Sequence, residues 1–73
     1  MLVSNAVRTF LKLEGVNEEG CAVLTRALQA VEGVIDVEVS IEDQIASVLY
    51  DVRVDVPRLV AAVKQAGYDA RPL

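Results

Sequence analysis

Histidine is absent from this 73-residue sequence, and cysteine occurs only once, as Cys21. The lack of histidine removes the commonest general base and the commonest transition-metal ligand at the same time. A single thiol excludes an internal disulfide, so the fold has to be held together by its core alone. No nucleophile–base pair and no cofactor motif is present either, and the sequence therefore argues against an enzyme.

Long hydrophobic runs and clusters of basic residues are missing as well. No apolar run approaches the roughly 20 residues of a membrane-spanning helix, and residues 1–8 lack the pattern of a signal peptide. Seven Lys and Arg residues are scattered among eleven Asp and Glu residues, for a net charge of −4, whereas nucleic-acid binding needs clustered positive charge. These absences, with the single unpaired thiol, predict a cytoplasmic domain that contacts neither a membrane nor nucleic acid.

Aliphatic residues are what the sequence has in quantity. Hydrophobic residues make up 53% of it, charged residues 25% and aromatic residues only 4%. This composition is typical of a globular chain with an aliphatic core and argues against disorder. The length predicts one domain over residues 1–73, with no linker or repeat.

The spacing of apolar residues changes along the chain and predicts six elements. Alternation of apolar and polar residues predicts strands, and apolar spacings of three and four predict helices. In chain order we expect a strand over 6–14, a helix over 21–32, strands over 34–41 and 45–51, a helix from Asp55 to Gly67, and a strand over 68–72. Asn17 is the expected N-cap of the first helix, and the short polar turn at 42–44 predicts an antiparallel hairpin.

The order β-α-β-β-α-β predicts an α+β, ferredoxin-like sandwich, in which two helices cover one face of a four-stranded antiparallel sheet. Right-handed crossovers place the first and third strands in the centre. On the open face of such a sheet we expect Phe10 and Leu49 to meet, with Ile45 nearby. Adjacent exposed apolar residues indicate an interface, although scattered ones are normal on a protein surface.

Several short stretches carry a resemblance to a known family. They are Leu11-x-Leu13-x-Gly15-Val16, Ala27-Leu28, Gly33-Val34, Val37-x-Val39, Ala46-x-Val48-x-Tyr50-Asp51 and Leu59-x-x-Ala62-Val63-x-x-Ala66-Gly67-Tyr68. With these stretches nearly the whole chain resembles the heavy-metal-associated domain, which occurs in small copper chaperones and at the N-termini of metal-pumping ATPases. The resemblance implies metal ion binding or transport, with a metal-transporting ATPase or another metal-handling protein as partner.

The family's metal motif, Met-x-Cys-x-x-Cys, is broken in this sequence. In the family, two thiolates converge where the first strand meets the first helix, and they bind Cu(I) or Zn(II). Aligned on Gly15, the two cysteine positions are Glu18 and Cys21. Aligned on the helix, they are Asn17 and Gly20, and the one-residue deletion falls in the loop, which tolerates deletions better. We favour the second alignment, and neither contains Cys-x-x-Cys.

The candidate metal ligands are Cys21, Glu18 and Glu19. A thiolate with a carboxylate suits Zn(II) or another divalent ion better than Cu(I), and a dimer in which two Cys21 thiolates meet would supply a thiolate pair. Two alternatives stay open. Cys21 is also a candidate core residue, because it shares a helical stripe with Leu24 and Leu28. The two glutamates also suit the positive end of the helix dipole.

Two functions of different classes follow from these residues and motifs. The first is an atypical metal-binding module that transfers its ion to a partner by exchange of thiolate ligands. The second is a metal-free protein-interaction module, homodimeric or bound to another partner, that keeps the fold and uses its sheet face or its loop. The resemblance also places Tyr68 near the metal loop, where it shields a site or packs over the start of the first helix. The exposure and reactivity of Cys21 distinguish the two functions.

Overall fold

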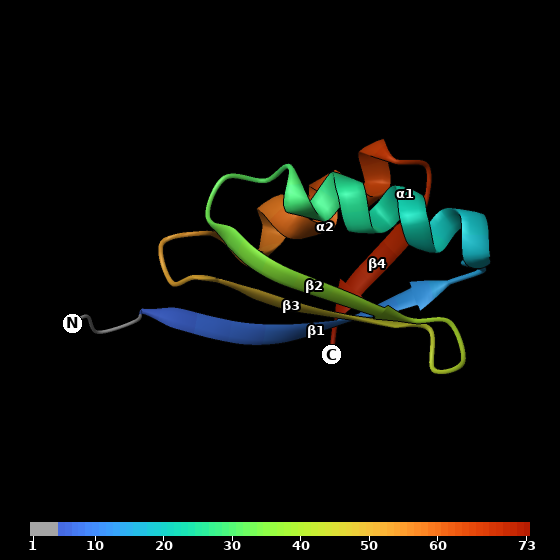
Figure 1. The fold of residues 1–73 in the computed structure, drawn as a ribbon, viewed down its shortest axis with the longest axis horizontal. Helices are drawn as coiled ribbons and strands as arrows, with labels where there is room; N and C mark the ends of the chain where they lie inside the picture. Colours follow the sequence, from blue (N-terminus) through green and yellow to red (C-terminus); the bar gives the residue numbers. More distant parts are fainter. Residues whose placement is uncertain (1–4) are drawn as a thin grey trace.

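The computed structural model describes residues 5–73 and has two layers, a sheet and a pair of helices (Figure 1). Its elements are β1 Ala6–Glu14, α1 Glu18–Gln29, β2 Val34–Ser40, β3 Ile45–Asp51, α2 Val56–Gln65 and β4 Asp69–Pro72. The strands form one antiparallel sheet in the order β2-β3-β1-β4. The α+β, ferredoxin-like fold is therefore confirmed, with β1 and β3 in the centre.

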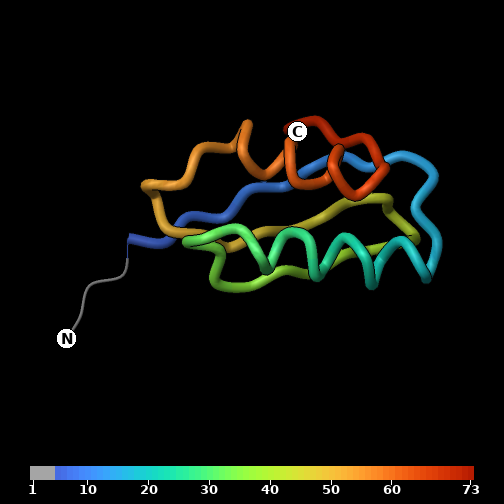
Figure 2. The backbone as a smooth tube through the Cα atoms, turned by 90° about the horizontal axis from the view of Figure 1, so that it is seen from above, coloured from blue at the N-terminus to red at the C-terminus, as the bar shows by residue number. Residues whose placement is uncertain are grey.

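Both helices lie on the same face of the sheet, side by side above the strands (Figure 2). None of the helices within residues 5–73 is long and apolar enough to cross a membrane. The expectation about a signal peptide concerned residues 1–8, of which residues 1–4 lie outside the described part of the chain.

Alternation along the two central strands determines which side chains enter the core. On β1, Leu11 and Leu13 face the helices and are buried, and on β3 the same holds for Ala46, Val48 and Tyr50. The helices contribute Leu24, Leu28, Leu59 and Val63, all of them fully buried. All buried residues of the core except Tyr50 are aliphatic, as the low aromatic content predicts. The other face of the sheet is left uncovered by the helices.

The first helix begins earlier than the sequence pattern predicts, at Glu18 instead of residue 21, and it ends at Gln29 instead of residue 32. The cap explains the early start. The Asn17 side chain accepts a hydrogen bond from the Gly20 N–H at 2.8 Å, so the first turn closes directly after Asn17. Gly20 is thereby drawn into the helix and is buried.

The remaining boundaries deviate by a few residues. β2 ends at Ser40, one residue earlier than expected, and β4 begins one residue later, at Asp69.

Asp55 occupies the N-cap position of α2, but its side chain makes no capping hydrogen bond, and Pro57 lies in the first turn. Proline is accepted there because the first-turn N–H groups have no partner within the helix.

Candidate functional site

The segment that corresponds to the metal loop of the resemblance, residues 15–21, comprises the connection from β1 and the first turn of α1, and is called the candidate loop below. Gly15 turns the chain out of β1 with φ of +65°, a conformation that costs glycine no steric strain. Val16 is next and only 3% exposed, so it anchors the candidate loop in the core. Asn17 then caps α1, and the Cys21 N–H donates to the Asn17 carbonyl at 2.8 Å. The candidate loop is therefore held at both ends.

Gln44, in the turn between β2 and β3, holds the candidate loop from the side. Its Oε1 accepts a hydrogen bond from the Val16 N–H at 2.9 Å, and its Nε2 donates to the Val16 carbonyl at 2.9 Å and to the Ile41 carbonyl at 2.8 Å. Its own carbonyl accepts from the Leu13 N–H at 2.7 Å. The sequence pattern did not reveal this role, because Gln44 and Val16 are 28 residues apart and nothing local distinguishes Gln44 from any polar turn residue.

Gln44→Glu is expected to lower the free energy of unfolding by about 1–3 kcal/mol, because a carboxylate cannot donate to the two carbonyls and leaves them unsatisfied. Urea unfolding followed by circular dichroism measures the loss, and hydrogen exchange at the Val16 amide shows whether the candidate loop is released. Gln65→Glu, at an exposed position, is the matched control and should shift stability by no more than about 0.5 kcal/mol. Equal losses in the two variants, or unchanged exchange at Val16, would contradict this role of Gln44.

Cys21 lies in the first turn of α1 and is partly exposed. Its carbonyl accepts a hydrogen bond from the Thr25 hydroxyl at 2.8 Å. The alternative that placed Cys21 in the buried stripe with Leu24 and Leu28 is wrong, because the helix starts early and Gly20 takes the buried place four residues before Leu24. Cys21 therefore lies between the core and the surface, and its reactivity toward a thiol reagent stays a prediction.

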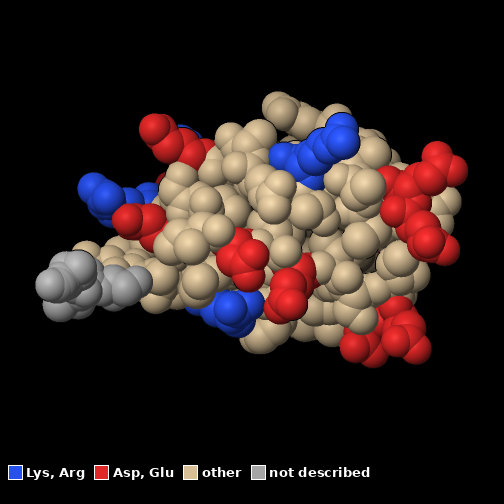
Figure 3. All heavy atoms as spheres, viewed as in Figure 1, with Lys and Arg blue, Asp and Glu red and all other residues tan. Residues whose placement is uncertain are grey.

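Glu18 and Glu19 are both exposed in the same turn of α1 as Cys21. Acidic side chains gather at this end of the molecule (Figure 3). Glu18 precedes Cys21 by three residues and shares its side of the helix, whereas Glu19 precedes it by two and does not. Within residues 5–73 no three side chains of His, Cys, Asp or Glu come together as a metal-binding group. A metal site built on Cys21 and one glutamate stays a proposal.

Tyr68 packs over the start of α1, as one of the two expectations for it states. It follows α2, and its ring lies so close to Gly20 that a Cβ added there would come within 2.6 Å of the Tyr68 hydroxyl oxygen. Any side chain at position 20 would have to displace this ring. The alignment that puts the second cysteine position at residue 20 therefore assigns it to a place that Tyr68 already fills.

The open face of the sheet carries the second candidate site. Phe10 lies opposite Ser47 in the register of β1 and β3, which makes Ile45 and Leu49 its diagonal neighbours. Phe10 is 47% exposed, and Ile45 and Leu49 are half-buried. Phe10, Ile45 and Leu49 are called the sheet patch below. Phe10 and Ile45 also line a shallow hollow, together with Glu38. That a partner binds to the sheet patch stays a prediction.

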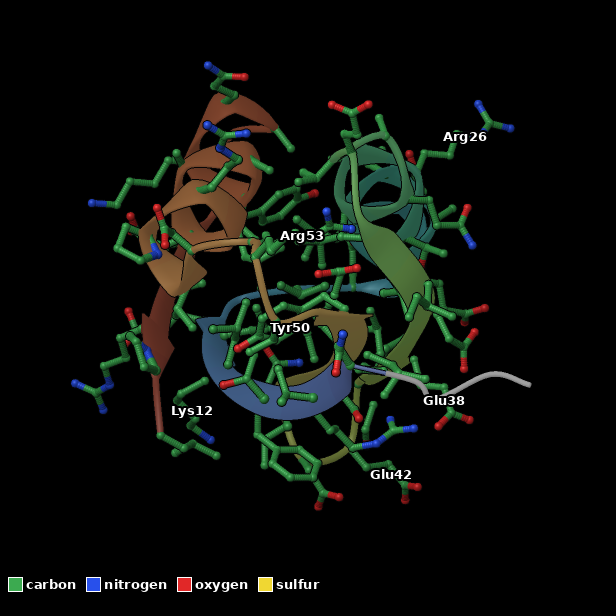
Figure 4. All side chains as sticks on the ribbon, turned by 90° about the vertical axis from the view of Figure 1, so that its left-hand side faces the viewer. Lys12, Arg26, Glu38, Glu42, Tyr50 and Arg53 are labelled. Atoms are coloured by element: carbon green, nitrogen blue, oxygen red, sulfur yellow. The ribbon has the colours of Figure 1, made fainter. Side chains whose placement is uncertain are left out.

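At the other end of the sheet, far from the candidate loop, Asp51 is engaged by Arg53. The guanidinium donates from Nε and Nη2 to the two carboxylate oxygens, each at 3.0 Å, and Figure 4 shows Arg53 at this end. Hydrogen bonds from the Arg53 side chain and backbone lower the pKa of Asp51 to about 2. The Asp51 carboxylate is therefore ionised and already paired at ordinary pH, which makes it a poor candidate for an ion site.

Comparison with known proteins supplies the family. The profile described as "Heavy-metal-associated domain" matches residues 11–69, from the middle of β1 to the first residue of β4. The chain belongs to the heavy-metal-associated domain family. The match includes the candidate loop, α1, the β2–β3 hairpin and α2, so the family assignment rests on most of the fold.

Individual relatives agree with this assignment. Over 65 residues the chain is 38% identical to a mercuric reductase of Acidithiobacillus ferrooxidans, covering 88% of this chain but only 12% of that relative. A structure described under "Crosstalk between Cu(I) and Zn(II) homeostasis" shares 32% identity with a TM-score of 0.87, covering 92% of this chain and 99% of the other. The CopZ metallochaperone shares 28% identity with a TM-score of 0.84, covering 89% and 100%.

These matches support a role in metal binding or transport at the level of the family. Domains of this kind are small metallochaperone-like modules, and the enzyme among the relatives is a far longer protein of which this chain spans about an eighth.

Proposed function

We propose that this chain, as a single domain over residues 1–73, is an atypical metal-handling module that holds its ion through Cys21. The observation that supports this most directly is the position of Cys21, a partly exposed residue in the first turn of α1, close to the connection from β1. The thiolate is the form of cysteine that binds metal ions.

One thiolate alone leaves most of the coordination of an ion open. Glu18 is placed to supply a carboxylate oxygen beside Cys21, and such a mixed pair suits Zn(II) better than Cu(I). Two chains that each contribute Cys21 would instead offer the thiolate pair that Cu(I) prefers. The similarity to a mercuric reductase adds Hg(II), another soft ion with an affinity for thiolates, to the ions worth testing.

Such an open site favours transfer over storage. A partner with exposed thiolates, such as a metal-transporting ATPase or another metal-handling protein, would take the ion by successive exchange of ligands. The low number of ligands from this chain keeps its affinity below that of a partner with two thiolates. We place this exchange in the cytoplasm, where thiols stay reduced.

Titration of the reduced protein with Zn(II), Cu(I) and Hg(II), in parallel with Cys21→Ala, tests the proposal. Saturable binding to at least one ion is expected, and Cys21→Ala should weaken it by at least about a hundredfold, since the outright loss of a ligand exceeds the 10–100-fold effect of removing its supporting contacts. Glu18→Gln should weaken Zn(II) binding while the matched variant Glu19→Gln leaves it unchanged. A stoichiometry of one ion per two chains would indicate a shared pair of Cys21 thiolates. Binding that survives in Cys21→Ala contradicts the proposal.

The second candidate is a metal-free protein-interaction module that keeps the family fold. Two observations favour it: the absence of Cys-x-x-Cys and the exposure of Phe10 in the sheet patch. Failure to bind any of the three ions, together with an association that depends on the sheet patch, would support this candidate over the first.

A further inference from the structure

We propose that Gln44 is a positioning residue for Cys21: its side chain latches the candidate loop to the turn between β2 and β3, and this latch controls how often the first turn of α1 opens. This role deepens the proposed function and rests on it for the task of Cys21 in ion binding. The latch itself is a property of the fold and is testable without an ion. It is indicated by the strained backbone of Gln44, by the hydrogen bonds of its amide, and by the short path from these bonds to Cys21.

The backbone of Gln44 is strained. Within residues 5–73, Gln44 is the only residue other than glycine with a positive φ, of +54°. A side chain in this left-handed region crowds its own backbone, so glycine, and less often asparagine or aspartate, are the usual residues there. Glycine would complete the turn over residues 41–44 without this strain. Strained residues persist where the surrounding structure fixes them, and they cluster at functional sites. The side chain of Gln44 therefore has a task that glycine could not perform.

The hydrogen bonds of the Gln44 amide show this task. Its Oε1 accepts from the Val16 N–H and its Nε2 donates to the Val16 carbonyl, both at 2.9 Å. Nε2 also donates to the Ile41 carbonyl at 2.8 Å, within the same turn. The turn and the connection from β1 to α1 lie at the same end of the molecule (Figure 1, Figure 2). One amide thus ties both backbone groups of Val16 to the turn between β2 and β3, and this pair of bonds is called the latch.

A short path along the chain leads from the latch to Cys21. Asn17 follows Val16 directly and holds the first turn of α1 by two bonds. Its side chain accepts from the Gly20 N–H and its carbonyl accepts from the Cys21 N–H, each at 2.8 Å. On the other side of Val16, Gly15 has a φ of +65° and changes its backbone angles at little steric cost. When the latch opens, Gly15 lets Val16 and Asn17 move together, and the cap on the turn of Cys21 loosens with them.

The latch thereby controls access to the thiol. Cys21 is only partly exposed while the first turn of α1 is closed, and it becomes freely accessible when that turn opens. Such local opening breaks a few contacts and does not require global unfolding. The Val16 side chain, 3% exposed, resists the movement and keeps opening rare. A closed latch retains a bound ion, and an open latch releases it for exchange with the thiolates of a partner.

Gln44→Gly separates the latch from the stability of the whole domain. The variant loses the bonds of the amide, but it also relieves the backbone strain at position 44, so its two effects on global stability oppose each other. Gln44→Asn is the second variant, because asparagine tolerates the left-handed region while its amide is one methylene short of Val16. Glu42→Gly is the matched control, since Glu42 lies in the same turn and is exposed.

The first measurement is the rate at which Cys21 of the reduced, metal-free full chain reacts with a thiol reagent. Gln44→Gly and Gln44→Asn should react at least tenfold faster than wild type, after division by any change in the global unfolding constant from urea unfolding. The loss of about two hydrogen bonds is enough for this factor. Glu42→Gly should react at the wild-type rate. Equal rates in wild type and Gln44→Gly, or an equal rise in Glu42→Gly, would overturn the role of Gln44.

Hydrogen exchange locates the opening. In Gln44→Gly the amides of Val16 and Cys21 should exchange at least tenfold faster, whereas the amide of Leu28, a buried residue of the same helix, should follow only the change in global unfolding. A uniform rise at all three amides would mean that the whole domain is destabilised, and it would contradict the latch.

Ion release connects the latch to the proposed function. Of Zn(II), Cu(I) and Hg(II), the ion that the wild-type protein binds most tightly should pass to a chelator at least tenfold faster from Gln44→Gly. Equal rates of release from a loosened candidate loop would overturn the control of ion release by Gln44. A wild-type protein that binds none of the three ions contradicts the proposed function instead, and thiol labelling and hydrogen exchange then still decide whether Gln44 holds the turn of Cys21.

Discussion

Glu18→Cys should raise the affinity of this chain for Cu(I) by about 10²–10⁴-fold, because the second thiolate then binds as an intramolecular ligand. The variant creates Cys-x-x-Cys with Cys21, the spacing that the family uses. Positions 18 and 21 are both in the first turn of α1 and share one side of it. Glu18 is exposed, so its replacement removes no packing. Competition with a Cu(I) chelator measures the gain.

Glu19→Cys is the matched control for this gain. It also brings the number of thiols to two, at an equally exposed position of the same turn, but residues two apart on a helix do not face each other. Its Cu(I) affinity should stay near that of the wild-type protein. Equal affinities in the two variants would show that the number of thiols matters and that their placement on α1 does not.

The other alignment predicts a different rebuilt motif, Asn17→Cys with Gly20→Cys, and the structure opposes it. The first change removes the side chain that caps α1, at a cost of about 1 kcal/mol. The second places a Cβ 2.6 Å from the Tyr68 hydroxyl oxygen. A rebuilt thiol pair at 17 and 20 is therefore expected to cost more stability than one at 18 and 21.

Leu28→Ala is expected to lower the free energy of unfolding by about 2–5 kcal/mol, since it combines lost burial with a cavity in the core. Leu28 is 0% exposed and belongs to the cluster that joins α1 to the sheet. In a domain of this size, whose total stability lies at the low end of about 5–15 kcal/mol, that loss would leave little margin. Thermal and urea unfolding followed by circular dichroism measure it.

The control for Leu28→Ala is Val23→Ala on the same helix. Val23 is 46% exposed, so its truncation should change stability by no more than about 0.5 kcal/mol. If both variants unfold at the same urea concentration, burial of Leu28 does not hold α1 to the sheet.

Local patterns in the sequence were sufficient for the order of the elements, the inner faces of the strands and the class of fold. The alternation that predicts a strand over 6–14 is observed in β1, where Leu11 and Leu13 are buried, because a side-chain period of two depends only on the backbone of a strand. Asn17 was likewise identified as the cap of α1, since capping involves residues three apart in the chain. The absence of Cys-x-x-Cys is also a property of the sequence alone, and no folding can supply the missing thiol.

Only the tertiary structure decided how the candidate loop is held. Gly20 is a poor helix former and precedes the helix expected from residue 21, but it lies inside α1, where the Tyr68 ring from the far end of the chain packs against it. That shift left Cys21 partly exposed. The bond between Gln44 and Val16 joins residues 28 positions apart, and the exact register of β1 and β3, which places Phe10 opposite Ser47, is likewise set by the fold. Such contacts arise from long-range packing, which leaves no periodic signal in the sequence.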